Sequence, residues 1–144
     1  MENLPPLTPE HIRAIFSTQP FDEACVDRVA PYYADDAVFV DPIQTLHGRD
    51  AFVAMNKRLL ARVRELRFDV HALAADDGNV FLAWTMHVTM KSPAKSMSVE
   101  GVTHCVLRNG QIVSHRDHWD LVGSIVGAIP VVGPAYRSIV AKLG

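Results

Sequence analysis

The spacing of hydrophobic and polar positions changes near the middle of the chain. In the first half, apolar residues recur at intervals of three and four, which is typical of amphipathic helices. The clearest case opens at His47-Gly48-Arg49-Asp50, and its apolar positions are Phe52, Met55, Leu59, Leu60 and Val63. After Glu65 apolar and polar residues alternate, as they do in strands that bury one face. The pattern predicts a helical first half and a strand-rich second half.

Capping and turn residues set the expected bounds of these elements. Thr8 can accept a hydrogen bond from a free N–H group, and Pro9 suits a first helical turn. Two helices are expected first, at residues 8–16 and 22–33. A short strand at residues 37–40 and a third helix at residues 49–63 follow them. Asp76-Asp77-Gly78-Asn79 and Asn109-Gly110 are turn signals. The expected strands of the second half are residues 67–75, 80–90, 97–108 and 111–121.

These elements predict an α+β fold. The consecutive long strands form an antiparallel meander, long enough to twist and bend. Because the sheet must bury one face, we expect the three N-terminal helices to cover it. The 144 residues suit a single domain. Residues 122–144 are apolar and punctuated by glycine, and we interpret them as a lid or packing segment over the domain's own core, with a gate or subunit contact as the alternative.

Bulk properties exclude several classes of partner. A net charge of −2 gives no electrostatic reason to expect nucleic acid or an anionic membrane. The first residues lack a signal peptide's basic start and apolar run, so we expect a cytoplasmic protein. The longest apolar stretch, Leu121 to Val132, is too short to cross a bilayer. Cys25 and Cys105 are far apart and are expected to be buried free thiols.

Strand alternation predicts the chemistry of the buried face. If Asp117 faces inward, His115 and Trp119 do so too, while Arg116 and His118 face outward. The inward positions on the two neighbouring strands include Thr103, Trp84 and Met86. Apolar walls with a few convergent polar groups are typical of a small-molecule site. The outward histidines at positions 87, 104 and 118 favour a subunit interface over a metal site, because no carboxylate-backed ligand spacing accompanies them.

Three motifs carry a resemblance to a known family. They are YADDAVFVDP from Tyr33 to Pro42, HGRDAF from His47 to Phe52, and NGQIVSHRDHWDL from Asn109 to Leu121. In this order they resemble the nuclear transport factor 2-like superfamily and, within it, the SnoaL-like branch, with ketosteroid isomerase and limonene-1,2-epoxide hydrolase as relatives. The resemblance implies a cone-shaped curved sheet closed by helices, a deep apolar pocket, and a homodimer through the outer face of the sheet.

The two relatives imply different roles for the acids. Asp41 stands where ketosteroid isomerase has its proton-shuttling aspartate, but Ser17 and Thr103 stand where that enzyme has its oxyanion donors. Losing such donors costs on the order of 3 kcal/mol each, so that mechanism is not expected here. Asp117 matches the water-activating aspartate of limonene epoxide hydrolase. Phe39 and Asp41 replace that enzyme's tyrosine and asparagine on the same water.

The remaining triad positions of the epoxide hydrolase also differ. Trp84 and Met86 replace its arginine and second aspartate. Without the arginine nothing obvious in the sequence orients Asp117, and without the second aspartate nothing obvious protonates an epoxide oxygen. Epoxide hydrolysis by that set of residues is not expected either.

Two functions remain open. The first is a cofactor-independent enzyme of isomerase, hydrolase or cyclase type on an apolar polyketide-, terpene- or steroid-like substrate, with Asp117 and Asp41 as acid–base groups assisted by His115. The second is a non-catalytic binding module for an apolar ligand. The expected substrate-binding residues are Tyr33, Phe39, Trp84, Met86, Thr103 and Trp119. Asp41 could instead form an Asx turn before Pro42. No cofactor or metal is expected, and no nucleotide-binding glycine motif is present.

Overall fold

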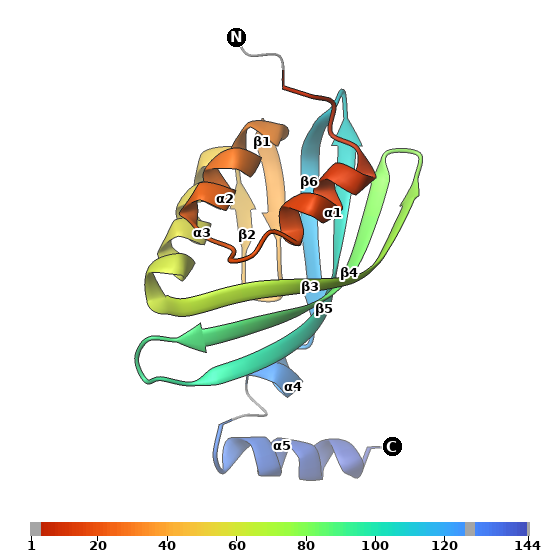
Figure 1. The fold of residues 1–144 in the computed structure, drawn as a ribbon. Helices are drawn as coiled ribbons and strands as arrows, with labels where there is room; N and C mark the ends of the chain where they lie inside the picture. The colour runs from red at the N-terminus through yellow and green to blue at the C-terminus, as the bar shows by residue number, and fades with distance from the viewer. Residues whose placement is uncertain (1–3, 126–128, 144) are drawn as a thin grey trace.

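A computed structural model of the protein describes residues 4–125 and 129–143. Helices come first and a long meander of strands follows (Figure 1). The elements in chain order are α1 (Pro9–Phe16), α2 (Glu23–Val29), η1 (Ala30–Tyr32), β1 (Tyr33–Val40), β2 (Thr45–His47), α3 (Arg49–Arg62), β3 (Val63–Asp76), β4 (Asn79–Met90), β5 (Ser96–Arg108), β6 (Gln111–Trp119), α4 (Leu121–Ser124) and α5 (Val132–Ala141).

The six strands form one curved, unclosed sheet in the order β2-β1-β6-β5-β4-β3. The α+β fold class is confirmed. The predicted sheet was antiparallel throughout, and this is wrong for one pair: β1 runs parallel to β6, with Val40 opposite Arg116. The alternation of apolar residues shows which face a strand buries but carries no information on its direction.

Local capping follows the sequence. The Thr8 hydroxyl accepts a hydrogen bond from the His11 amide at 3.1 Å, and the Asp22 carboxylate accepts one from the Cys25 amide at 3.0 Å. These bonds satisfy amide groups that the first turn of a helix leaves free. The predicted starts of the first two helices are therefore confirmed.

Two boundaries differ from the prediction. Tyr33 was expected at the end of the second helix but begins β1, and Val63 was expected in the third helix but begins β3. Val63 pairs with Met90 of β4 and is only 5% exposed. A β-branched residue fits such a buried strand position better than a helix end, so a tertiary contact overrides the helical spacing there.

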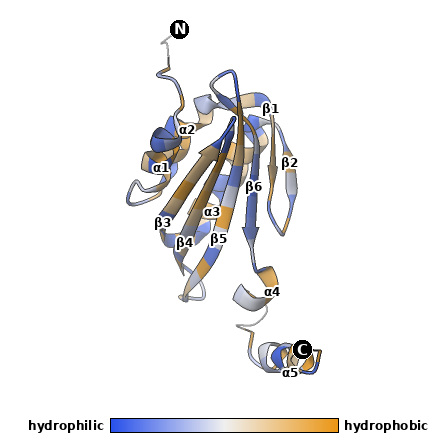
Figure 2. Cartoon of the chain, turned by 90° about the vertical axis from the view of Figure 1, so that its right-hand side faces the viewer, coloured by the Kyte–Doolittle hydropathy of each residue, from blue (hydrophilic) through white to orange (hydrophobic). Residues whose placement is uncertain are grey.

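Helices α1 to α3 lie on one face of the sheet (Figures 1 and 2). The main core cluster joins that face to the helices, and its most buried members are Ile12, Tyr33, Val80, Leu82, Cys105 and Ile112. Cys25 and Cys105 are both buried free thiols, as predicted. Among the described residues, no helix combines the length and apolar character needed to cross a membrane.

One close approach within the sheet depends on glycine. Gly101 of β5 lies between Trp84 of β4 and Trp119 of β6 in the strand register. A Cβ atom built on Gly101 would overlap the indole ring of Trp84 and would lie 2.9 Å from the His118 carbonyl oxygen. The missing side chain therefore gives Trp84 its place on the inner face.

The C-terminal segment leaves the sheet after β6. The Asp120 carboxylate caps α4 by accepting a hydrogen bond from the Gly123 amide at 2.8 Å. Helix α5 lies beyond the end of the sheet (Figure 1), and its Ile139 side chain is 61% exposed. Part of the predicted lid or packing segment, residues 126–128, lies outside the described residues. Its role therefore stays a prediction.

We expect Gly101→Ala to lower the free energy of unfolding by about 1–3 kcal/mol, because the added methyl group displaces the Trp84 ring. Urea denaturation followed by tryptophan fluorescence measures this loss. Glu100→Ala, at the neighbouring exposed position, is the matched control and should change stability little. A Gly101→Ala protein as stable as the wild type would contradict the close packing inferred here.

Candidate functional site

A cavity of about 460 Å³ lies between the sheet and the helices. Its size is within the range of small-molecule sites. Most of its wall is apolar, including Phe16, Phe39, Phe52, Phe68, Trp84 and Met86. The titratable side chains that also line it include Asp117, His115 and Asp41. The predicted apolar pocket with a few polar groups is therefore present in the structure.

Asp117 is held through one of its two carboxylate oxygens. Its Oδ1 atom accepts a hydrogen bond from the Thr103 hydroxyl at 2.5 Å and lies 2.9 Å from His115 Nε2. Thr103 stands opposite Asp117 in the β5–β6 register, so the sheet itself brings these two side chains together. Within the described chain Oδ2 has no hydrogen-bond partner, and the side chain is 20% exposed. Asp117 therefore has a fixed orientation, and its Oδ2 atom is bonded to no other described residue.

A second layer of side chains holds the two donors. The indole N–H of Trp84 donates to the Thr103 hydroxyl at 2.8 Å, and the Tyr33 hydroxyl lies 2.6 Å from His115 Nδ1. An indole N–H can only donate, so the Thr103 hydrogen is free to point at Asp117. A neutral His115 with its proton on Nε2 satisfies every group, because it donates to Asp117 and accepts from Tyr33. Trp84 and Tyr33 therefore donate to Thr103 and His115, and these two residues donate to Asp117.

Tyr33 stays a neutral donor over a wide pH range. Burial raises the pKa of its hydroxyl well above the usual value of 10.0, and the nearby Cys105 and Asp117 add to the shift. Its ring also stacks on Phe52, with 4.4 Å between ring centroids. The phenol is therefore locked by packing as well as by its bond to His115.

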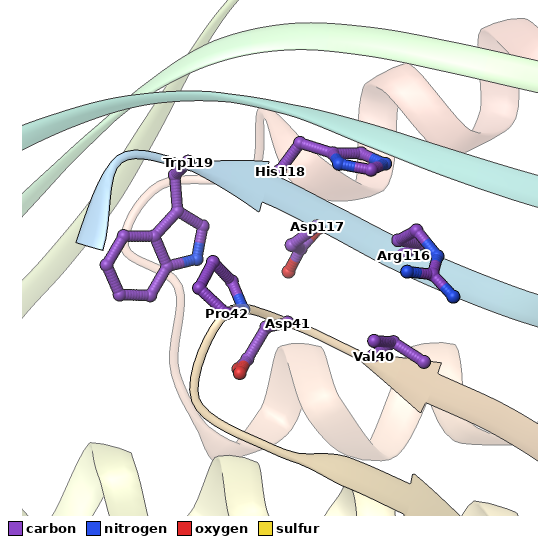
Figure 3. Close-up of a pocket in the computed structure, with 7 residues that line it drawn as sticks. All are labelled: Val40, Asp41, Pro42, Arg116, Asp117, His118 and Trp119. Carbon is purple, nitrogen blue, oxygen red and sulfur yellow. The ribbon is translucent and has the colours of Figure 1, made fainter. Parts of the chain in front are cut away.

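Asp41 is close to Asp117 but is bonded differently. The parallel pairing of β1 and β6 brings the ends of the two strands together, and both acids line the surface depression in Figure 3. Asp41 Oδ1 accepts hydrogen bonds from the amides of Ile43 at 2.7 Å and Gln44 at 2.9 Å. The Asx-turn alternative is therefore what the backbone shows. A catalytic role for Asp41 stays a prediction.

Most of the predicted contact residues do face the cavity. Tyr33, Phe39, Trp84, Met86 and Trp119 line it, as do the predicted catalytic residues. Thr103 is 2% exposed and does not line the cavity, so its contribution is the hydrogen bond that holds Asp117.

The expectation that nothing obvious in the chain orients Asp117 is wrong. Thr103 and His115 perform that task here, although neither corresponds to a residue of that enzyme's triad. The period-two pattern had already placed both on the same inward face as Asp117, so a signal for this was present.

Sequence reasoning missed the polar residues that α3 contributes to the cavity. Asn56, Arg58 and Arg62 all line it. Their helical spacing beside the apolar positions of α3 was the available signal. The direction of α3 relative to the sheet was needed to use it.

The outward histidines have separate partners. His87 contacts Asp69 and Ser98, each at 2.8 Å, and His104 lies 2.8 Å from the Asn79 side-chain oxygen. In the part of the chain that the structure describes, no group of three or more histidine, cysteine, aspartate or glutamate side chains could hold a metal ion. These residues therefore give no evidence for a metal centre.

Comparison with known proteins gives the family. A family model described as a SnoaL-like domain matches residues 12–115. A comparison with curated protein sequences found no match.

Solved structures show the same fold. A candidate SnoaL-like polyketide cyclase from Jannaschia sp. CCS1 is 17% identical, with a TM-score of 0.71 and coverage of 85% of this chain and 93% of that one. An LEH-like epoxide hydrolase from M. tuberculosis is 19% identical, with a TM-score of 0.63 and coverage of 91% and 92%. A hypothetical protein from Catenulispora acidiphila DSM 44928 with a ketosteroid isomerase-like fold, in complex with trimethylamine, is 19% identical, with a TM-score of 0.68 and coverage of 83% and 92%.

We expect Thr103→Val to destabilise the protein by about 1–3 kcal/mol at nearly unchanged side-chain volume. The change leaves the buried Trp84 N–H without an acceptor and removes a donor from Asp117. Urea denaturation measures the loss. Thr103→Ser keeps the hydroxyl and is the control that should lose less. Equal stability of Thr103→Val and the wild type would show that the network contributes nothing.

The raised pKa of Tyr33 predicts a loss of stability in alkali. Above about pH 10 a tyrosine in the unfolded chain loses its proton while the buried Tyr33 keeps it. The unfolded state then binds fewer protons, so the free energy of unfolding falls as pH rises, by at most about 1.4 kcal/mol per pH unit for this group. Tyr33→Phe should show a shallower decline in denaturation series between about pH 9.5 and 11. Tyr136→Phe is the matched control, and a Tyr33→Phe slope equal to the wild-type slope would contradict the assignment.

Proposed function

The chain belongs to the SnoaL-like domain family, and we propose that it is a cofactor-independent enzyme in which Asp117 performs acid–base chemistry on an apolar polyketide-, terpene- or steroid-like molecule. Its structural neighbours include a candidate polyketide cyclase and an LEH-like epoxide hydrolase, which supports a reaction of cyclase or hydrolase type. The cavity volume of about 460 Å³ is compatible with a small multi-ring ligand.

The state of the two Asp117 oxygens is the observation that carries this proposal. Hydrogen bonds from Thr103 and His115 fix the plane of the carboxylate through Oδ1. Oδ2 keeps its lone pairs for a proton taken from substrate carbon or from a bound water. A base held in one orientation reacts without first having to be ordered.

His115 supports this chemistry as a positioning residue. It is 3% exposed and lies between Tyr33 and Asp117, so its imidazole is fully bonded. Transfer of a proton from His115 to the Tyr33 hydroxyl is unfavourable, because that phenol is already protonated and its pKa is raised. His115 therefore acts through Asp117, by holding Oδ1 and stabilising its charge.

Asp41 has a lesser part in the proposal. Its Oδ1 is occupied by two backbone amides, and its Oδ2 lies 3.5 Å from the Gln44 side-chain nitrogen. It remains a second negative charge on the cavity wall, where it can orient a water or a hydroxyl group. Reactions that need a single base fit this arrangement better than reactions that need two free carboxylates.

A homodimer through the outer face of the sheet remains part of the proposal. That face carries two large apolar side chains with unusual exposure, Phe81 at 40% and Val102 at 38%. Phe81 stacks on His104 of the neighbouring strand, with ring centroids 4.4 Å apart. An apolar and aromatic surface of this kind is suited to a contact between two copies.

The alternative function is uptake of an apolar ligand without chemistry, and the apolar walls of the cavity favour it as much as catalysis. We expect Asp117→Asn to separate the two. Asparagine can still accept the bonds from Thr103 and His115 through its oxygen, but it cannot take a proton. The enzyme reading predicts that ligand binding persists while turnover falls by about 10²–10⁴-fold.

The experiment screens polyketide-, terpene- and steroid-like compounds by thermal shift, then follows each hit by mass spectrometry. Wild type, Asp117→Asn, Asp41→Asn and Asp36→Asn are compared. Asp36 is exposed and outside the cavity lining, so its variant controls for a lost carboxylate. Asparagine at position 41 preserves the Asx turn, so that variant reports on charge alone. Hits that bind wild type and Asp117→Asn equally and are never converted would exclude the enzyme and leave the binding module.

A further inference from the structure

The cavity has a rim with an uneven distribution of charge. Four of its lining residues are exposed, and they are Ile43, Arg58, Arg62 and Ile125. Exposed lining residues mark where the cavity opens to solvent. Arg58 and Arg62 are four residues apart on α3, so their side chains project from the same side of the helix. Two guanidinium groups therefore share one edge of the opening.

These two arginines differ from the other cations of α3. Arg49 pairs with Asp35 at 2.7 Å and Lys57 pairs with Asp27 at 2.9 Å. Within residues 4–125 and 129–143, the side chains of Arg58 and Arg62 have no ion pair and no hydrogen bond. The cations of α3 that face away from the cavity are thus neutralised, whereas the two at its rim are not.

The protein supplies no carboxylate to this pair, although two carboxylates line the same cavity. Asp41 and Asp117 are both beyond ion-pair distance of Arg58 and Arg62. Further along the inner side of α3, Asn56 is 9% exposed and lines the cavity. Its Nδ2 atom donates to the Phe52 carbonyl at 3.0 Å, and Oδ1 has no partner among the described residues. The α3 wall therefore offers unused polar groups at its rim and inside.

We propose, building on the function proposed above, that Arg58 and Arg62 bind a carboxylate of the substrate at the mouth of the cavity. The planar guanidinium group matches a carboxylate with two parallel hydrogen bonds. The substrate is then an amphiphilic acid: its apolar body fills the cavity toward Asp117, and its charged end stays at the rim.

Electrostatics gives this substrate one orientation. The carboxylates of Asp117 and Asp41 repel a second negative charge, while the arginine pair attracts it. The whole chain carries a net charge of −2, so its overall field does not attract anions. A preference for an acid over a neutral molecule of the same shape must therefore come from local groups. The charged end is directed to α3, and the carbon atoms to be deprotonated are directed to Asp117.

The test compares acids with their amides, which have nearly the same shape and no charge. The probes are 2-naphthylacetate with 2-naphthylacetamide, and 4-biphenylacetate with 4-biphenylacetamide. Isothermal titration calorimetry at low salt measures their affinities for the wild type and for Arg58→Gln/Arg62→Gln. Arg13→Gln/Arg64→Gln removes the same charge from two exposed positions outside the cavity lining and is the matched control.

We expect the wild type to bind each acid about tenfold more tightly than its amide, a difference of about 1.4 kcal/mol. The Arg58→Gln/Arg62→Gln protein should bind the acid no better than the amide, with the amide affinity unchanged. The control protein should behave like the wild type.

Each other outcome overturns a distinct claim. Equal binding of acid and amide by the wild type overturns the carboxylate proposal and leaves the apolar pocket intact. An acid preference that the control double variant also loses overturns it too, because it would reflect overall charge. If no acid and no amide binds the wild type, the proposed small-molecule function fails together with this inference.

Discussion

A carboxylate inside an apolar cavity has to be paired, and the pairing of Asp117 sets conditions that extend across the sheet. Hydrogen bonds offset the cost of placing a polar group in an apolar surrounding, and two donors reach Oδ1, from Thr103 and His115. Each donor is held in turn by a group behind it, the Trp84 indole or the Tyr33 hydroxyl. The contacts join β1, β4, β5 and β6. The geometry of the site therefore depends on the pairing register of all four strands.

The shape of the cavity and the orientation of the Asp117 carboxylate both depend on the Trp84 side chain. Trp84 forms part of the apolar wall and also donates to Thr103. Its ring occupies space that a side chain at Gly101 would take. A change in the packing of this ring would alter the wall and release the hydroxyl that holds Asp117. In a buried network of this kind, the loss of one hydrogen bond leaves other polar groups without partners and lowers stability. The orientation of Asp117 is therefore coupled to the stability of the sheet.

The sequence predicted the features that local periodicity controls. Alternation placed Asp117 and His115 on the same face, because side chains two positions apart on a regular strand point the same way. The parallel pairing of β1 with β6 was not predictable in this way, since Tyr33 and His115 are 82 positions apart and no local pattern joins them. Arg58 and Arg62 escaped notice for another reason. Helical periodicity identifies apolar positions, whereas long charged side chains reach a cavity rim from beside the apolar stripe.

Asp41 and Asp117, the two acids at the end of the β1–β6 pair, have different hydrogen-bond partners because their backbones differ in conformation. Asp41 follows a strand that ends in a tight turn, so the amides of that turn occupy its oxygen. Asp117 stands within a strand whose amides already belong to the sheet ladder, so only side chains can reach it. Side-chain donors were supplied to one oxygen and not to the other. Reactivity at this site is therefore concentrated on Asp117 Oδ2, and a substrate gains from the cavity only if its reacting atom lies within reach of that oxygen.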